Sequence, residues 1–133
     1  MVFLFAGEAD VGLLVLRVVL GLIFIYHSIP KLKAPSLMAK GMGKSKSFVS
    51  LLGITEFVAG LFLILGFLTR FGALLIVIVM LGALYHKLVK WKVPFSSMDK
   101  LGWEFDIILL AAAIALIFLG DGAISIDAFI PWA

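Results

Sequence analysis

An apolar stretch with one carboxylate inside it constrains this chain more than any other feature. Residues 48–68, FVSLLGITEFVAGLFLILGFL, are long enough to cross a bilayer as a helix, and Glu56 lies within them. Gly53 precedes Glu56 by three residues and Gly60 follows it by four, so the three residues share one helical face. A charge facing lipid at this depth costs roughly 2.5–3.5 kcal/mol, whereas glycines let a neighbouring helix come close. The stretch therefore predicts a membrane helix whose Glu56 face packs against protein.

Three other segments have the same apolar character, namely residues 11–29, 71–89 and 103–120. At about 1.5 Å per residue, each can cross a hydrocarbon core roughly 30 Å thick with tilt or slight thinning of the bilayer. Strand-like alternation is absent, and lipid cannot satisfy backbone polar groups, so helices are the expected spanning structure. We therefore predict an all-α fold, in which residues 1–133 form a single transmembrane domain. It is a four-helix transmembrane bundle with helices at about 11–29, 48–68, 71–89 and 103–120.

The segments between and after these helices also have recognisable patterns. Residues 30–47 hold two prolines, two glycines and five lysines, which is typical of a surface loop. Only Thr69 and Arg70 separate the second and third helices, so these helices are expected to form a tight antiparallel hairpin. The segment after Gly120 is too short to span the membrane and is expected to rest at its interface.

The charged residues predict the orientation of this bundle. Hydrophobic residues make up 64% of the 133 residues and charged residues 14%, where soluble domains are nearer half and a quarter. All nine lysines fall within 31–46 or 87–100, and these two connections share one side if there are four spans. The positive-inside rule places both connections in the cytoplasm and both termini outside, an N-out/C-out topology in the cell (cytoplasmic) membrane. The net charge of +3 thus indicates topology and attraction to anionic lipid, and no nucleic-acid partner is expected.

Five ionisable side chains are candidates for a functional site: Arg17, His27, Glu56, His86 and Glu104. The two histidines lie about 3–5 Å from the inner ends of their helices, and Glu104 begins the fourth helix in the same layer. Glu56 lies deeper, and Arg17 approaches it from the outer side across an axial gap of roughly 9 Å. We expect a polar column in which Glu56 exchanges a proton and the other four residues line a pocket. Intramembrane ionisable groups commonly mark such sites.

Each candidate also has a structural interpretation. Arg17 and Glu56 can tie helices together, and the two histidines can bond to lipid headgroups. Glu104 shares a helical face with Ala111 and Ala115, but it can also be a carboxylate at a helix start. Asp106 is two residues from Glu104, so it is expected to point the opposite way and to stabilise the helix N-terminus.

The residue spacing limits the available chemistry. The absence of cysteine excludes thiolate catalysis and cysteine-ligated clusters, and the Glu-x-x-His motif of a di-iron bundle is missing. No metal site and no covalently bound cofactor are expected. His27 and His86 could hold a b-type haem between two helices, but this is disfavoured. A quinone headgroup fits better, because it needs an apolar slot with a hydrogen-bond donor and a nearby proton acceptor, which His27, Glu56 and His86 can provide.

Three blocks of sequence together resemble the DoxX family: LRVVLGLIFIYHSIPKL (16–32), GITEFVAGLFLILGFLTRFGALLIVIVMLGALYH (53–86) and GWEFDIILLAAAIALIFLGDGAISIDAF (102–129). The resemblance implies a small four-helix membrane protein. It also implies a link to redox systems, since relatives are associated with the quinol oxidase and thiosulfate:quinone oxidoreductase system of acidophilic archaea or with redox-defence enzymes. Several residues match types that the family pattern tends to carry: Arg17, His27, Glu56, Gly60, Arg70, His86, Trp103 and Glu104. Ser28 and Ala59 depart from it, since glycine is usual at both positions.

These observations lead to one leading hypothesis and two alternatives. We expect a membrane subunit of a quinone-linked oxidoreductase system, with a polar pocket near the cytoplasmic side of the bundle. The first alternative is a non-catalytic membrane anchor or assembly scaffold for a partner protein. The second is a small transporter or proton pathway. The expected partners are the lipid bilayer and either a second protein or further copies of this chain.

Overall fold

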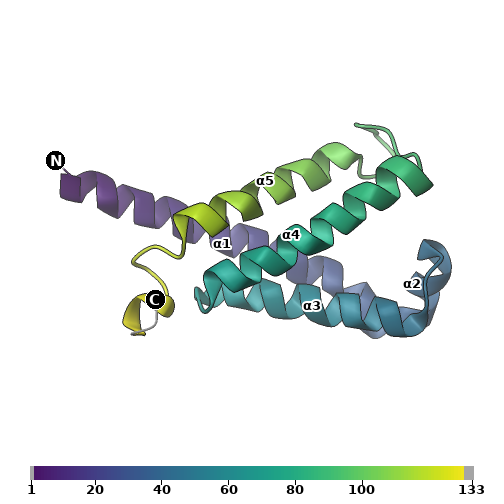
Figure 1. The fold of residues 1–133 in the computed structure, drawn as a ribbon, viewed down its shortest axis with the longest axis horizontal. Coiled ribbons are helices and arrows are strands. Elements are labelled where there is room, and N and C mark those ends of the chain that lie inside the picture. Colours follow the sequence, from purple (N-terminus) through teal and green to yellow (C-terminus); the bar gives the residue numbers. More distant parts are fainter. Residues whose placement is uncertain (1, 131–133) are drawn as a thin grey trace.

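The computed structural model describes residues 2–130, and every regular element in that range is a helix. Figure 1 shows the α-helices, which are α1 (Val2–Lys33), α2 (Pro35–Met42), α3 (Lys46–Leu65), α4 (Thr69–Tyr85) and α5 (Trp103–Leu119). A π-helical turn, η1 (His86–Lys90), extends α4, and a short 3-10 helix, η2 (Asp127–Phe129), lies in the C-terminal segment. The prediction of an all-α fold is confirmed.

Three of these helices are long and apolar enough to cross a membrane. They are the Gly7–Lys33 part of α1, all of α3, and α4 together with η1. The protein is therefore a multi-pass membrane protein. Helix α5 has 17 residues and is about 26 Å long, which is shorter than a hydrocarbon core of roughly 30 Å. A fourth span through α5 stays a prediction.

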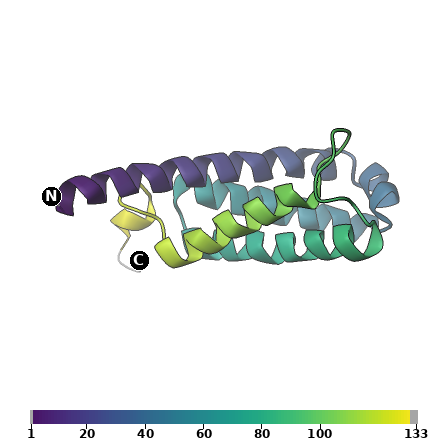
Figure 2. The same cartoon turned by 90° about the horizontal axis from the view of Figure 1, so that it is seen from above.

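The long helices form two pairs that diverge toward one end of the bundle. Helix α1 packs along α3, α4 packs along α5, and the short connection between α3 and α4 joins the pairs (Figures 1 and 2). In Figure 1 the pairs separate toward α2 and the connection 91–102, which with the neighbouring helix ends carry the lysines. We call this the lysine-rich end and the opposite end, with residues 120–130, the tail end. The divergence creates room for a cavity at the lysine-rich end.

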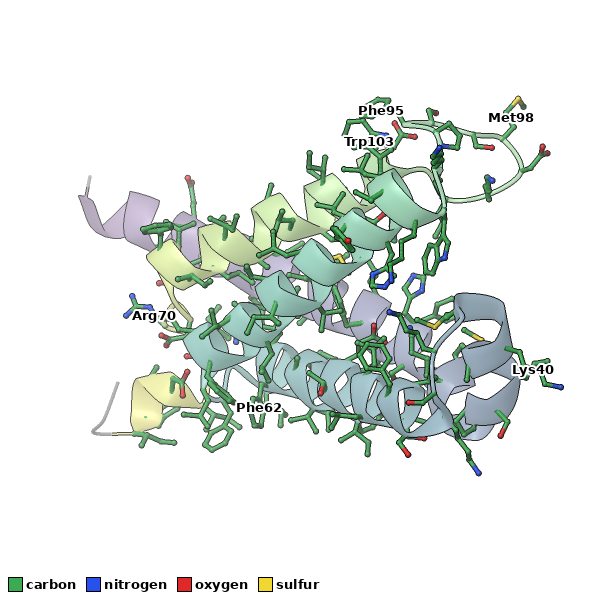
Figure 3. All side chains as sticks on the ribbon, turned by 45° about the vertical axis from the view of Figure 1, so that its right-hand side comes forward. Lys40, Phe62, Arg70, Phe95, Met98 and Trp103 are labelled. Carbon is green, nitrogen blue, oxygen red and sulfur yellow. The ribbon has the colours of Figure 1, made fainter. Side chains whose placement is uncertain are left out.

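Side chains suited to the membrane interface mark both ends of the bundle (Figure 3). Lys40 and Met98 project at the lysine-rich end, where the rings of Phe95 and Trp103 meet edge to face at 4.5 Å. Arg70 lies at the tail end and is exposed, as expected for a residue near the α3–α4 turn. Aromatic and basic residues favour headgroup depth, so their positions agree with helices that lie across a bilayer.

Backbone contact between α1 and α3 confirms the predicted glycine face. A Cβ atom on Gly60 would lie 2.7 Å from the Gly21 carbonyl oxygen, and one on Gly21 would lie 2.6 Å from the Gly60 carbonyl oxygen. Nearer the lysine-rich end, a Cβ on Gly53 would lie 2.9 Å from the Lys31 Cβ. The helices can approach this closely only because these positions lack side chains. The face that carries Glu56 therefore packs against α1.

Two helix boundaries differ from those predicted at the first connection. Helix α1 was expected to end at residue 29, before Pro30, but it continues to Lys33. Proline lacks an N–H donor and its ring crowds the preceding turn, but the Pro30 carbonyl still accepts from the Ala34 N–H at 2.9 Å, so helical hydrogen bonding continues past it. The connection 30–47 was expected to be a surface loop, yet it contains α2. Pro35 suits the first position of that helix, and Gly43 ends it with φ of 67°.

The predicted antiparallel hairpin of α3 and α4 is confirmed, and the C-terminal segment caps its turn. The turn spans residues 66–68, rather than the predicted residues 69 and 70, and Leu68 adopts a left-handed conformation with φ of 47°. The Asp127 carboxylate accepts the backbone N–H groups of Leu68 at 2.8 Å and of Thr69 at 3.0 Å. In return, the N–H of Asp127 donates to the Gly66 carbonyl at 2.8 Å. The tail therefore satisfies donors that the start of α4 leaves unpaired.

Replacing Asp127 with asparagine is expected to lower the free energy of unfolding by about 1–2 kcal/mol. Asparagine has one acceptor oxygen, so its amide group would face the second N–H of the turn. Denaturation by SDS in mixed micelles, followed by far-UV circular dichroism, measures the loss. Asp99→Asn is the matched control, because Asp99 is exposed in the connection 91–102. Equal stability of the two variants would contradict this cap.

Candidate functional site

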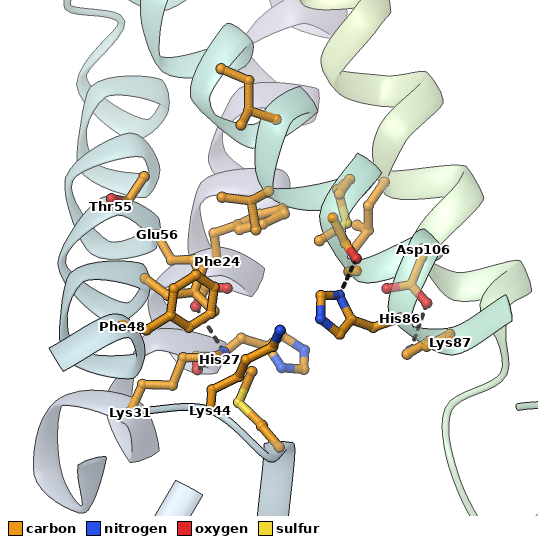
Figure 4. A pocket seen from close by; sticks show the side chains of 18 of the residues that line it. Phe24, His27, Lys31, Lys44, Phe48, Thr55, Glu56, His86, Lys87 and Asp106 are labelled. Carbon is orange, nitrogen blue, oxygen red and sulfur yellow. Dashed lines mark hydrogen bonds and ion pairs between the residues drawn. The ribbon is translucent and has the colours of Figure 1, made fainter. Parts of the chain in front are cut away.

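A cavity of about 460 Å³ lies between the two helix pairs at the lysine-rich end (Figure 4). All four long helices contribute to its wall, and Met42, Trp91 and Leu101 add side chains from α2 and the connection 91–102. The wall is mostly apolar. Its polar side chains are His27, Lys31, Lys44, Thr55, Glu56, His86, Lys87 and Asp106. An apolar slot with a few converging polar groups is the usual form of a small-molecule site.

Three of the five predicted site residues meet at this cavity. His27 comes from α1, Glu56 from α3 and His86 from the first position of η1. Figure 4 shows both imidazole rings pointing into the cavity. The ring of His27 packs against Phe105 with centroids 5.7 Å apart, and that of His86 packs against Trp91 at 5.3 Å. Helical depth correctly placed these groups together, while the chemical role of each stays a prediction.

The charge partner of Glu56 is a lysine that the sequence analysis did not single out. Lys31 Nζ lies 2.9 Å from Glu56 Oε2 and also donates to the His27 carbonyl at 3.1 Å. Both side chains are largely buried, with 12% of Lys31 and 5% of Glu56 exposed. Lys31 shares one helical face with Arg17 and Ser28, so the sequence pattern could have identified it as a site residue. It was assigned to the first connection because α1 was expected to end before Pro30.

Arg17 does not reach Glu56, which corrects the predicted polar column. It lies at the tail end, fully buried, and its guanidinium donates to the carbonyls of Leu63, at 3.5 Å, and Ile124. Asp121 is one of the carboxylates whose charge acts favourably on it. The C-terminal segment thus provides oxygen atoms close to Arg17, so the side chain has no need to extend toward the centre. Arg17 is a tie between α1 and the tail, and the cavity residues form a separate group.

Glu104 and Asp106 occupy the opposite positions to those expected. Asp106 is buried and lines the cavity, where its Oδ2 lies 2.6 Å from Lys87 Nζ. Glu104 is exposed and borders a shallow hollow beside the connection 91–102 instead. The cause is the choice of packing face on α5. Bulky Leu109 and Leu116, at helical spacing from Asp106, fill the core, whereas the small-residue face that aligns with Glu104 is turned away from it.

Positive charge is in excess at the cavity. Lys31 and Lys87 are each paired with a carboxylate, and Lys44 is the third lysine on the wall. Partial desolvation and the nearby positive charge of Lys90 hold the pKa of Lys44 below its usual range. The Lys44 ammonium lies 5.6 Å from the centroid of the Phe48 ring. The polar or electron-rich part of a ligand is therefore attracted to this end of the cavity.

The ionisable side chains on the cavity wall differ in whether they have a charged partner. Within residues 2–130, no group of three or more histidine or acidic side chains is placed to hold a metal. Both cavity carboxylates are engaged by lysines, while the two imidazoles face the open volume. A mostly apolar molecule with one or two polar atoms is chemically compatible with these walls.

Fold and site together define an all-α, multi-pass membrane protein with a cavity between helix pairs. The chain belongs to the DoxX family, whose sequence pattern matches residues 12–91. A Bacillus subtilis protein named "Putative oxidoreductase CatD" is 29% identical to this chain, in an alignment that covers 91% of this chain and 88% of that protein. "Uncharacterized membrane protein Rv3486" of Mycobacterium tuberculosis is 26% identical, in an alignment that covers 91% of this chain and 82% of that protein. No solved structure matches.

Proposed function

We propose that this chain is the membrane subunit of a quinone-linked oxidoreductase system and that its cavity binds the quinone ring. The main support for this proposal is the cavity, which combines a mostly apolar volume of about 460 Å³ with two imidazoles and two ion pairs. The name of the Bacillus subtilis relative supports an oxidoreductase setting. Electrons would come from a partner protein that carries a redox centre.

The proposal assigns a different role to each group of cavity residues. His27 and His86 hydrogen-bond the polar atoms of the ring, while Phe24 and Phe105 provide apolar surface. Glu56 holds or releases a proton at its carboxylate, and Lys31, rather than Arg17, controls its charge. Such a role requires an apolar wall that keeps bulk water away from the carboxylate.

The proposal also includes an orientation. The lysine-rich end faces the cytoplasm, α5 completes a fourth crossing, and both termini lie outside. The distribution of lysines supports this orientation, because basic residues near helix ends favour the cytoplasmic side. The slot then opens toward the cytoplasmic leaflet, where a soluble partner can reach it.

Quinone binding tests this function directly. Purified protein in lipid nanodiscs is titrated with decylubiquinone, and saturable quenching of tryptophan fluorescence is recorded, since Trp91 lines the cavity. We expect His27→Leu to weaken binding about three- to ten-fold through loss of a hydrogen bond. Tyr26→Phe is the matched control, because Tyr26 is the neighbouring residue and is 72% exposed. Quenching that does not saturate, or that is the same in protein-free nanodiscs, would refute the proposal.

One observation favours the scaffold as a second candidate. Each cavity carboxylate already has a lysine partner. A purely structural role, in which the two ion pairs fix how the helices pack, therefore also accounts for these four side chains. A scaffold predicts that Glu56→Gln changes assembly with a partner without changing partner turnover. A proton-exchanging Glu56 predicts loss of turnover in an assembled complex.

A further inference from the structure

The hydrogen bond of one cavity histidine determines which atom it offers to a ligand. His86 Nδ1 lies 2.8 Å from the carbonyl oxygen of Gly82, one helical turn earlier. A carbonyl oxygen can only accept, so Nδ1 must carry the hydrogen. In the neutral imidazole, the other nitrogen, Nε2, then has a lone pair and no hydrogen. The α4 backbone thus makes His86 an acceptor toward the cavity.

This acceptor is buried and unused. His86 Nε2 has no hydrogen-bond partner within residues 2–130, and His86 lines the cavity. None of the three lysines on the wall donates to Nε2. Lys31 is engaged by Glu56 and Lys87 by Asp106, and Lys44 makes no hydrogen bond to this nitrogen. A buried acceptor without a donor is unfavourable, so a ligand that brings a hydroxyl or N–H group to Nε2 is favoured over one that brings a carbonyl.

The two redox forms of a quinone differ in this property. The oxidised ring presents carbonyl oxygens, which only accept, whereas the reduced ring presents two hydroxyl groups, which can donate. We propose that the cavity binds the reduced, hydroquinone form in preference to the quinone, with one ring hydroxyl donating to His86 Nε2. This inference rests on the proposed function and adds the redox form of the ligand and the atom that selects it.

Other groups on the wall are compatible with a hydroquinone. The second hydroxyl can donate to a carboxylate oxygen of Glu56 or accept from His27, both of which line the same cavity. The aromatic rings of Phe105 and Trp91, which contact the two histidines, flank the volume in which a flat ring would lie. Selection between the two redox forms nevertheless depends on His86, because its Nε2 is the buried acceptor without a partner.

A comparison of the two redox forms tests the inference. Dissociation constants of decylubiquinol and decylubiquinone are measured on the protein in nanodiscs at pH 8, without oxygen, by competition against a fluorescent ring analogue. We expect the reduced form to bind about three- to ten-fold more tightly, as one hydrogen bond implies. His86→Phe should weaken binding of the reduced form more than binding of the oxidised form, so that the preference between the two forms is lost. His86→Gln keeps an acceptor oxygen on the side chain and should restore part of the preference.

The controls separate the possible outcomes. Tyr85→Phe changes the exposed neighbour of His86 and should preserve the ratio, and circular dichroism shows whether each variant is folded. Equal binding of both forms by the unmodified protein, or a preference that survives in His86→Phe, would overturn this inference while leaving quinone binding intact. Binding of neither form would overturn the proposed function and this inference with it.

Discussion

Gly60→Ala is expected to lower the free energy of unfolding by about 2–3 kcal/mol, although alanine is normally the better helix former. The added methyl group would lie 2.7 Å from the Gly21 carbonyl oxygen and 2.8 Å from Ile25 Cγ1. Backbone atoms of a helix cannot rotate away as a side chain does, so α1 and α3 must separate. Separation would loosen the packing along the whole length of the α1–α3 pair.

Gly12→Ala is the matched control for this prediction. Gly12 also lies inside α1, but a Cβ atom there would have no neighbour within 4 Å. The substitution should therefore be neutral or stabilise the protein by up to about 1 kcal/mol, the usual gain from glycine to alanine in a helix. SDS denaturation in mixed micelles, followed by far-UV circular dichroism, compares the two variants. Similar stabilities for Gly60→Ala and Gly12→Ala would show that the helices do not cross at Gly21 and Gly60.

This crossing illustrates what the sequence can predict. The spacing of Gly53, Glu56 and Gly60 indicated a face that packs against another helix, because glycine lets a second helix approach closely and a charged glutamate is costly against lipid. Apolar length similarly located α3 and α4. These features are local and depend on one helix at a time. The spacing of these residues did not predict which helix would pack against the glycine face.

The sequence predicted correctly only those site residues whose position depends on depth along a helix and not on how the helix is rotated. Counting residues from the lysine-rich helix ends places His27 and His86 at matched depth and Glu56 deeper on the same side, and all three line the same cavity. The prediction that Asp106 points away from the pocket was wrong because the rotation of α5 about its own axis could not be predicted. Small residues suggested one face, but the volume between the helix pairs needed leucines on another.

The C-terminal segment was the least predictable part. Residues 120–130 have no helical or strand periodicity, and they were expected to rest at the interface. In the structure their backbone provides acceptors for Arg17 and donors for the α3–α4 turn, while their position at the membrane interface stays a prediction. Backbone hydrogen bonds depend on the path of the chain, and the Asp127 carboxylate accepts from N–H groups 58 and 59 residues earlier, so the local residue pattern did not predict this cap.

Breaking the ion pair beside the cavity is expected to lower the free energy of unfolding more than any other substitution predicted for this chain. Lys31→Met would leave the Glu56 carboxylate, which is 5% exposed, without the ammonium 2.9 Å away. Removal of one partner of a buried pair typically costs about 3–5 kcal/mol, because the remaining charge is desolvated and uncompensated. Glu56→Gln should cost less, since Lys31 is 12% exposed and its long side chain can extend toward the lysine-rich end.

The double variant Lys31→Met/Glu56→Gln provides the decisive comparison. It removes both charges, so its loss of stability should be smaller than that of Lys31→Met alone, and the two single effects should be strongly non-additive. Glu104→Gln is the control for removing a carboxylate, and because Glu104 is exposed it should change stability by no more than about 0.5 kcal/mol. Additive single effects in the same SDS denaturation assay would mean that the two side chains do not pair. The control of Glu56 by Lys31 in the proposed function would then have no basis, because that role depends on their contact.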